Sequence, residues 1–125
     1  MTLQITKGEL EAIARAMGKG DITWIDDLPT IEYTKEESEA NHGVSGYCWN
    51  PATGGNPADN DAMCCELEVN LNWYQSYGGL YELEANMGGH YRTVQIADFP
   101  NKQAAKAYAS CKVVAAVQLE KEKKR

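Results

Sequence analysis

The spacing of apolar residues near the N-terminus predicts a helix over residues 6–17. The stripe recurs at intervals of three and four residues, which places its side chains on one helical face, and it comprises Leu10, Ile13, Ala14 and Met17. Thr6 and Glu9 have the spacing of a capping box at its start. Gly18 stands where a residue in the left-handed conformation would end the helix.

The pattern then changes from apolar to strongly acidic. Residues 21–25 (DITWI) predict a short strand that is buried on both faces. Residues 26–41 set a single lysine, Lys35, against a group of carboxylates that comprises Asp26, Asp27, Glu32, Glu36, Glu37 and Glu39. Thr34 and Glu37 could cap a short helix, but no apolar stripe supports one. We therefore expect a solvated acidic excursion.

Residues 42–61 (HGVSGYCWNPATGGNPADND) are dense in glycine, asparagine and proline, which favour turns. Tyr47 and Trp49 bring two large rings into this segment. We expect an ordered aromatic Gly/Pro loop that these rings hold in place. The loop contains neither of the glycine patterns that bind nucleotide phosphates, G-x-x-x-x-G-K-[ST] and G-x-G-x-x-G.

The second half of the chain predicts a helix, a hairpin and a final helix. The first of these runs to about Tyr74, is capped by Asp59, Asn60 or Asp61, and has a stripe of Met63, Leu67, Leu71 and Tyr74. Residues 80–86 and 91–97 have the pattern of two half-buried strands joined by a turn at 87–90 (MGGH).

The final helix is predicted to begin at Lys102, with Asn101 as its cap. Its inner face consists of Ala104, Tyr108, Cys111, Ala115 and Leu119. Because strands and helices are segregated along the chain, the pattern favours an α+β fold in which helices pack on a small antiparallel sheet. No internal boundary divides residues 1–125, so we expect a single domain.

Three stretches resemble a group of small tailed-phage proteins of unassigned role, the NinX-like proteins and the related phage ABA sandwich domain. They are residues 47–63 (YCWNPATGGNPADNDAM), Trp73 with the strand pair, and residues 99–116 (FPNKQAAKAYASCKVVAA). The resemblance implies a bacteriophage origin and a helix-sheet-helix sandwich. It carries over no catalytic residue.

The charge distribution bears on the class of partner. The formal net charge is −6, and the basic tail 120–125 (EKEKKR) conceals a more acidic body, since residues 1–119 carry 8 basic and 16 acidic side chains. Such a body repels phosphate, so we expect no binding to duplex nucleic acid. No run of about 18 apolar residues predicts a membrane span. Without an export signal, the chain and its cysteines are expected to lie in the cytoplasm, the host cytoplasm if a phage encodes it.

Candidate chemistry is sparse. The four cysteines and the two histidines, His42 and His90, lack the paired spacing of a zinc site. Both histidines fall in turns rather than beside a serine or cysteine nucleophile. We expect no catalytic residue, no metal and no cofactor, and we interpret Cys111 and either Cys64 or Cys65 as small buried residues.

These observations favour a small accessory protein that binds a macromolecule, such as a host protein or nucleoprotein complex, and that inhibits host defence in the manner of anti-CRISPR proteins. The predicted contacts are the carboxylates of the acidic excursion together with Trp49, Tyr74 and Tyr77. A nucleotide-signal binder is the alternative, with Tyr47 and Trp49 stacking on a base and Arg92 or Lys102 meeting phosphate. A small enzyme is the third possibility.

Overall fold

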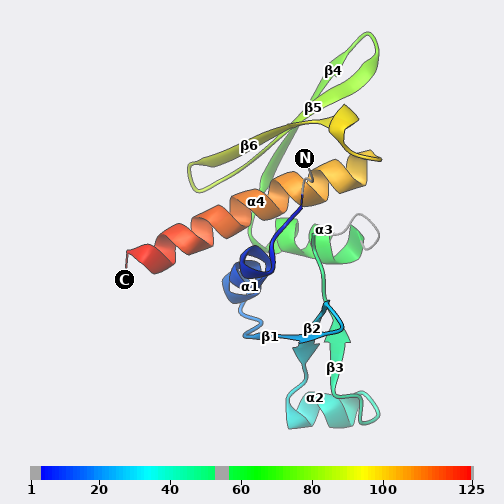
Figure 1. Ribbon diagram of the computed structural model, residues 1–125, viewed down its shortest axis with the longest axis vertical. Coiled ribbons are helices and arrows are strands. Elements are labelled where there is room, and N and C mark those ends of the chain that lie inside the picture. The colour runs from blue at the N-terminus through cyan, green and yellow to red at the C-terminus, as the bar shows by residue number, and fades with distance from the viewer. Residues whose placement is uncertain (1–3, 53–56, 125) are drawn as a thin grey trace.

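The computed structural model describes residues 4–52 and 57–124 and has the predicted α+β architecture. Its elements follow the chain in the order α1 (Lys7–Ala16), β1 (Ile22–Ile25), β2 (Leu28–Glu32), α2 (Lys35–Ala40), β3 (Gly46–Cys48), α3 (Pro57–Glu66), β4 (Asn70–Ser76), β5 (Gly79–Met87), β6 (His90–Gln95), the short 3-10 helix η1 (Ile96–Asp98) and α4 (Lys102–Lys123). The strands form two separate three-stranded antiparallel sheets, β1-β2-β3 and β4-β5-β6 (Figure 1).

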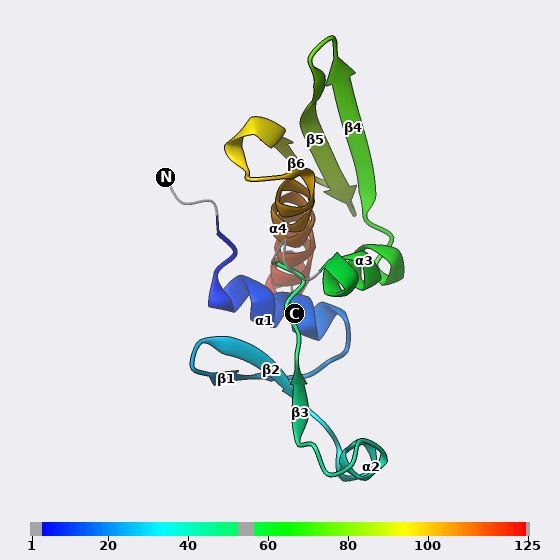
Figure 2. The ribbon, with the colours of Figure 1, turned by 90° about the vertical axis from the view of Figure 1, so that its right-hand side faces the viewer.

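The long helix α4 organises the molecule. Viewed nearly end-on, it lies between the β4-β5-β6 sheet on one side and α1 and α3 on the other (Figure 2). Alanine, serine and valine supply most of its buried positions, and these small side chains let a sheet and helices approach it closely. Asn101 caps its first turn, as predicted, by accepting a hydrogen bond from the backbone N–H of Ala104. The predicted inner-face residue Leu119 is 38% exposed instead, because the buried positions of α4 end at Val117.

The β1-β2-β3 sheet corrects the prediction for residues 26–61. Asp26 and Asp27 form the tight turn between β1 and β2, each with positive φ (50° and 64°). The return strand β2 buries Ile31 against the core, and β3 pairs with β2. The predicted excursion therefore contains a strand as well as the short helix α2, since two buried positions in five are enough to hold β2 in a sheet.

The β4-β5-β6 sheet contains the largest difference from the predicted elements. The helix expected to reach Tyr74 ends at Glu66, and residues 70–76 form strand β4. Glu68 takes a left-handed φ of 54° between them, which stops the helix. Residues 70–73 (NLNW) alternate between polar and apolar side chains, so they fit a strand as well as the predicted helical stripe. Pairing with β5 gives their backbone N–H and C=O groups hydrogen-bond partners. The predicted start of this helix was also wrong. Helix α3 begins at Pro57, ahead of the three residues predicted to cap it.

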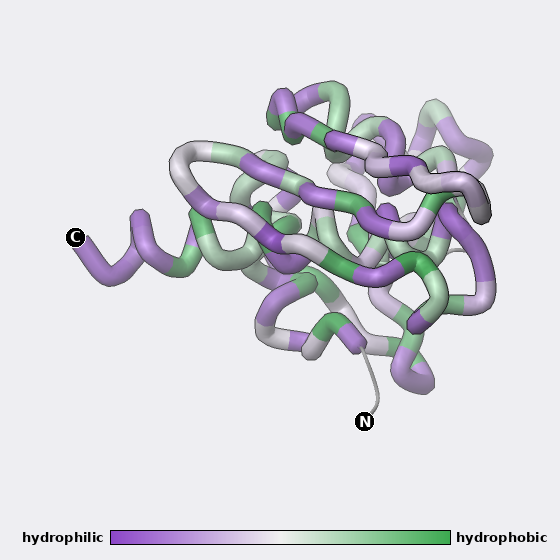
Figure 3. The backbone as a smooth tube through the Cα atoms, turned by 90° about the horizontal axis from the view of Figure 1, so that it is seen from above, coloured by the Kyte–Doolittle hydropathy of each residue, from purple (hydrophilic) through white to green (hydrophobic). Residues whose placement is uncertain are grey.

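The β5–β6 hairpin agrees with its prediction. The two strands pair antiparallel across the turn at Gly88 and Gly89, whose φ values of 56° and 84° suit glycine. One face of the sheet packs Leu83, Ala85 and Val94 against α4. The other face carries exposed polar and aromatic side chains, and hydrophilic and hydrophobic residues alternate along these strands (Figure 3).

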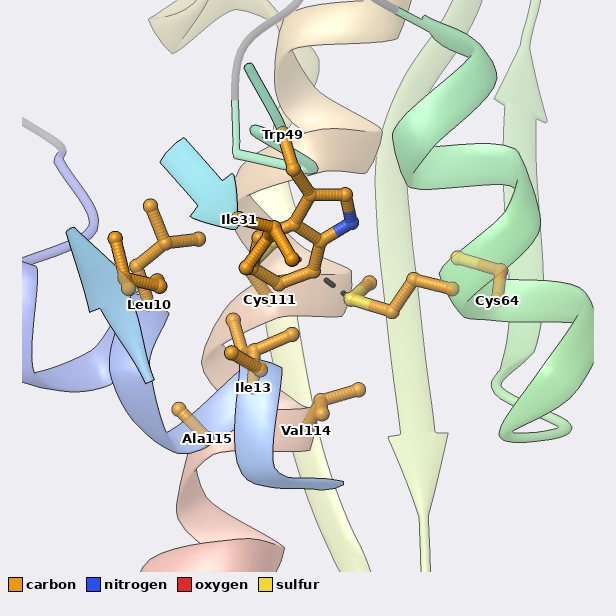
Figure 4. Packing of buried hydrophobic residues seen from close by; sticks show 11 residues of the cluster. Leu10, Ile13, Ile31, Trp49, Cys64, Cys111, Val114 and Ala115 are labelled. Atoms are coloured by element: carbon orange, nitrogen blue, oxygen red, sulfur yellow. Dashed lines mark hydrogen bonds between the residues drawn. The ribbon is translucent and has the colours of Figure 1, made fainter. Parts of the chain in front are cut away.

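Trp49 lies at the centre of the core on the opposite side of α4. Its side chain is only 2% exposed and packs in a cluster with Ile13 of α1, Ile31 of β2 and Cys111 of α4 (Figure 4). The prediction that rings hold the loop is confirmed for Trp49 in the described part of the loop, and residues 53–56 of the predicted loop lie outside the described residues. Its prediction as a partner contact is wrong, because a side chain buried at this depth presents no surface to a partner.

A buried polar network joins α3 to α4 beside this cluster. The Asn60 side-chain amide donates to the backbone carbonyl of Pro51 and to the hydroxyl of Ser110, each at 2.9 Å. Ser110 in turn donates to the carbonyl of Lys106 at 2.6 Å. These bonds connect Pro51, which follows β3, to helices α3 and α4. Asn60, which was predicted only as a helix cap, therefore holds three segments of the core together.

The cysteines divide into two buried and two exposed thiols. Cys64 and Cys111 are buried, while Cys48 and Cys65 are exposed, and all four are free. Burial raises the pKa of both buried thiols, which keeps them protonated and unreactive at neutral pH. This confirms the interpretation of Cys111 and of Cys64 as small buried residues.

Candidate functional site

The carboxylates of the predicted acidic excursion do not form one surface. Asp26 and Asp27 lie at one end of strand β2, and the glutamates of α2 follow the other end. The strand has five residues, which separates these groups by about 15 Å at roughly 3.3 Å per residue. The acidic residues therefore contribute a distributed negative field rather than a single docking patch.

Several of these carboxylates already have partners within the chain. Asp27 forms an ion pair with Lys7 at 2.6 Å, and the hydrogen bond and charge of that lysine lower the pKa of Asp27. Glu37 accepts from the backbone N–H of Thr34 in a capping box, which lowers the pKa of Glu37. Glu32 accepts a hydrogen bond from the hydroxyl of Thr23 at 3.2 Å.

Helix α2 presents its remaining glutamates at one extremity of the molecule. Glu36 and Glu39 are exposed, and none of its residues is buried. The helix lies at one end of the long axis of the molecule, and the turn between β4 and β5 lies at the other end (Figure 1). The two kinds of predicted contact, acidic and aromatic, are therefore placed far apart.

The β4–β5 hairpin brings three exposed tyrosines together, and we call Tyr74, Tyr77 and Tyr81 the hairpin tip. Tyr77 occupies the turn, and its exposure is 112% of that of a reference tyrosine. Tyr74 and Tyr81 are 40% and 43% exposed. The register shifts between Tyr74 and Gln75, an irregularity that bends strands and redirects side chains. Tyr81 was not among the predicted contacts. The irregularity leaves it without a directly paired residue in β4, and a register shift of this kind cannot be seen in the sequence pattern.

The charge of this hairpin is negative. Residues 70–87 contain Glu82 and Glu84 and no lysine or arginine. Glu82 pairs in register with Tyr74 across the two strands, next to the tip. The hairpin therefore combines rings with carboxylates, a composition that suits a basic protein surface.

Two cavities flank the β4-β5-β6 sheet where it meets α4. One, of about 360 Å³, lies under the hairpin and is lined by Trp73, Gln75, Leu80, Lys102, Gln103 and Lys106. The other, of about 290 Å³, is lined in part by Glu9, His90, Arg92 and Lys112. In the second cavity, each of these cationic or titratable side chains already has a partner: His90 contacts Glu120, Arg92 donates to Tyr108, and Lys112 contacts Glu9.

The residues of the predicted nucleotide site are dispersed. Trp49 is in the core, Tyr47 packs against Tyr33 with ring centroids 5.2 Å apart, and Arg92 bonds Tyr108. Lys102 alone of the four lines the cavity under the hairpin. The predicted base-stacking pair is wrong, because the ring of Trp49 is 2% exposed and packs in the core, where it cannot stack on a ligand.

The ion pair between Glu9 and Lys112 ties α1 to α4 and leads to a pH-dependence prediction. Burial tends to raise the pKa of Glu9, but hydrogen bonds with Thr6 and Lys112 outweigh it and hold that pKa below its ordinary value. The ionised carboxylate therefore stabilises the fold at neutral pH, and this contribution is lost as the pH falls through the lowered folded-state pKa. We expect Glu9→Gln to lower the free energy of unfolding by about 1 kcal/mol at neutral pH.

Urea unfolding of the wild type and of Glu9→Gln at a series of pH values measures this effect. The difference between the two proteins is expected to shrink as the pH falls from about 5 to about 3. Glu36→Gln, which removes an exposed carboxylate of α2, serves as the matched control and is expected to change stability by less than about 0.5 kcal/mol. A Glu9→Gln difference that is independent of pH would contradict the prediction.

Within residues 4–52 and 57–124, no group of three or more histidine, cysteine, aspartate or glutamate side chains is arranged to hold a metal ion. No helix of this described part combines the length and the apolar character needed to cross a membrane. Comparisons of the chain with protein-family models, with curated proteins and with solved structures found no match.

Proposed function

We propose that the protein acts by binding a macromolecular partner through the hairpin tip. The observation that carries the proposal is Tyr77, a large ring that is fully exposed at the turn of a hairpin projecting from the rest of the molecule (Figure 1). Exposed tyrosines offer a large contact area at a small cost in conformational entropy, and they are frequent in interface hot spots. Tyr74 and Tyr81 widen the same surface.

The partner that fits this surface is a protein with a basic, partly apolar face. The carboxylate of Glu82 lies in register with Tyr74, and the hairpin carries no opposing base. Arginine or lysine side chains of a partner can bind the tyrosine faces and the carboxylates together. The net charge of −6 and the glutamates of α2 then accelerate the approach of a basic partner from a distance, without contacting it.

The proposed setting is a bacteriophage protein in the cytoplasm of a bacterial host, acting on a host-defence complex as anti-CRISPR proteins do. The resemblance of residues 47–63 and 99–116 to small phage proteins supports the phage setting. Many defence complexes bind nucleic acid and therefore present basic surfaces, which supports the choice of such a complex as the partner.

Site-specific crosslinking tests the proposal. A photoreactive phenylalanine analogue at position 77 is expected to crosslink the chain to a partner in bacterial cells. The same analogue at position 91 is the control, because Tyr91 is also exposed but lies at the far end of the same sheet. Once mass spectrometry has identified the partner, Tyr77→Ala is expected to weaken its binding at least about thirtyfold, the effect of losing a hot spot, and Tyr91→Ala to leave it unchanged.

Two results would contradict the proposal. One is equal crosslinking from positions 77 and 91, and the other is unchanged affinity in Tyr77→Ala. The host-defence setting has its own readout, since expression of the chain is expected to raise phage plating on bacteria with an active CRISPR system, and Tyr77→Ala to abolish that gain. Failure of this assay alone would reject the setting and leave the tip as the binding surface.

A further inference from the structure

The cavity under the hairpin has an aromatic wall and a cationic wall. Trp73 and Leu80 form the apolar side from β4 and β5, and the first two turns of α4 contribute Lys102, Gln103 and Lys106. Trp73 is 37% exposed, so one part of its indole remains available to a ligand. The volume of about 360 Å³ lies at the small end of the range for ligand sites.

The charge of this cavity is opposite to that of the molecule. Its lining includes two lysines and no carboxylate, although the chain as a whole has a net charge of −6. Lys106 forms an ion pair with Asp61 of α3, which lies outside the lining. Lys102 makes no ion pair with any residue that the structure describes. A cation in this position is available to an anionic ligand.

Gln103 adds an unsatisfied hydrogen-bonding group. Its side-chain Nε2 is buried and has no hydrogen-bond partner among the described residues, and the residue lines the same cavity. An unpaired buried donor is costly, and a ligand oxygen that accepts from it would recover that cost.

We propose that this cavity binds a small planar aromatic anion of about the size of a mononucleotide. The ring of the ligand stacks on Trp73 and contacts Leu80. Its phosphate or carboxylate contacts Lys102, and a ring or acid oxygen accepts from the amide of Gln103. The site is separate from the hairpin tip, so this inference stands or falls independently of the proposed protein partner.

Calorimetric and NMR titrations with defined probes test the site. The probes are the four ribonucleoside monophosphates, the matching neutral nucleosides, inorganic phosphate, and benzoate as an aromatic carboxylate. We expect saturable binding of at least one aromatic anion, with its neutral or ring-free counterpart at least about tenfold weaker. Binding of a monophosphate identifies a nucleotide as the ligand class, and binding of benzoate alone identifies an aromatic acid. The side-chain amide of Gln103 and the indole N–H of Trp73 are expected to shift during the same titration.

Matched variants link binding to the cavity walls. Trp73→Leu and Lys102→Ala are each expected to weaken binding at least about tenfold. Lys35→Ala, which removes a lysine of α2 at the far end of the molecule, and Tyr77→Ala are expected to leave it unchanged. NMR spectra of each variant verify that it is folded. The proposal is overturned if no probe binds, or if binding survives in both Trp73→Leu and Lys102→Ala.

Discussion

Replacing Trp49 by alanine is expected to lower the free energy of unfolding by about 3–5 kcal/mol, a large part of the stability of a domain of this size. The indole is 2% exposed and packs against α1, β2 and α4 at once (Figure 4). Its removal takes away buried apolar area and leaves a cavity between elements that α4 holds in place. Urea unfolding followed by circular dichroism measures the change.

Two further variants make this prediction decisive. Tyr77→Ala removes a comparably large ring from the surface and is expected to change stability by less than about 0.5 kcal/mol. Trp49→Phe retains most of the apolar volume and keeps the experiment informative if the alanine variant does not fold. A cost below about 1 kcal/mol for Trp49→Ala would mean that the ring is not part of the core, and it would restore Trp49 as a candidate contact.

Replacing Asn60 by alanine is expected to lower the free energy of unfolding by about 2–4 kcal/mol. The change deprives both the carbonyl of Pro51 and the hydroxyl of Ser110 of a buried donor and opens a small cavity. The same unfolding experiment measures it. Asn72→Ala is the matched control, because its amide lies on the exposed face of β4 and bonds Glu84 at the long distance of 3.5 Å.

The isosteric change Asn60→Asp separates hydrogen bonding from volume. It preserves the shape of the side chain but replaces the donor amide with a carboxylate oxygen. That oxygen then faces the carbonyl of Pro51 and the hydroxyl of Ser110, both of which accept from the amide in the wild type. The change is therefore expected to destabilise the fold at neutral pH about as much as alanine does. Protonation restores a donor, and the loss is therefore expected to decrease at acidic pH. If Asn60→Asp had wild-type stability at neutral pH, the network would have no stabilising role.

Local signals predicted the parts of the fold that depend on neighbours in the sequence. The capping box of Thr6 and Glu9 and the cap at Asn101 are present as predicted. The glycine turn after β5 is present too. Each of these features depends on hydrogen bonds or backbone angles within a few residues, so the local sequence is enough to predict it.

Pairing across the chain decided the features that were mispredicted. The stripe of Met63, Leu67 and Leu71 fits a helix, yet from Asn70 onward the backbone pairs with β5. The strand β2 exists because β1 and β3 flank it. The hydrogen bonds of a strand go to residues distant in sequence, and periodicity over a short window cannot distinguish them from helical bonds.

The candidate sites divide in the same way. Tyr74 and Tyr77 are predicted as contacts from the sequence, and the structure exposes both. Their grouping with Tyr81 and the cavity between Trp73 and Lys102 depend on the register of β4 with β5 and on the position of α4. Trp49 has the same chemistry as these rings but lies in the core.

The sequence by itself determined the α+β class, the caps of α1 and α4, the β5–β6 hairpin and an acidic chain rich in aromatic residues. Only the tertiary structure decided which rings are buried, which carboxylates have partners, and which residues share a cavity. The reason is physical: capping and turn preferences act over a few bonds, whereas burial depends on which distant segments pack against a side chain, and the same tryptophan or tyrosine fits a core or a surface equally well.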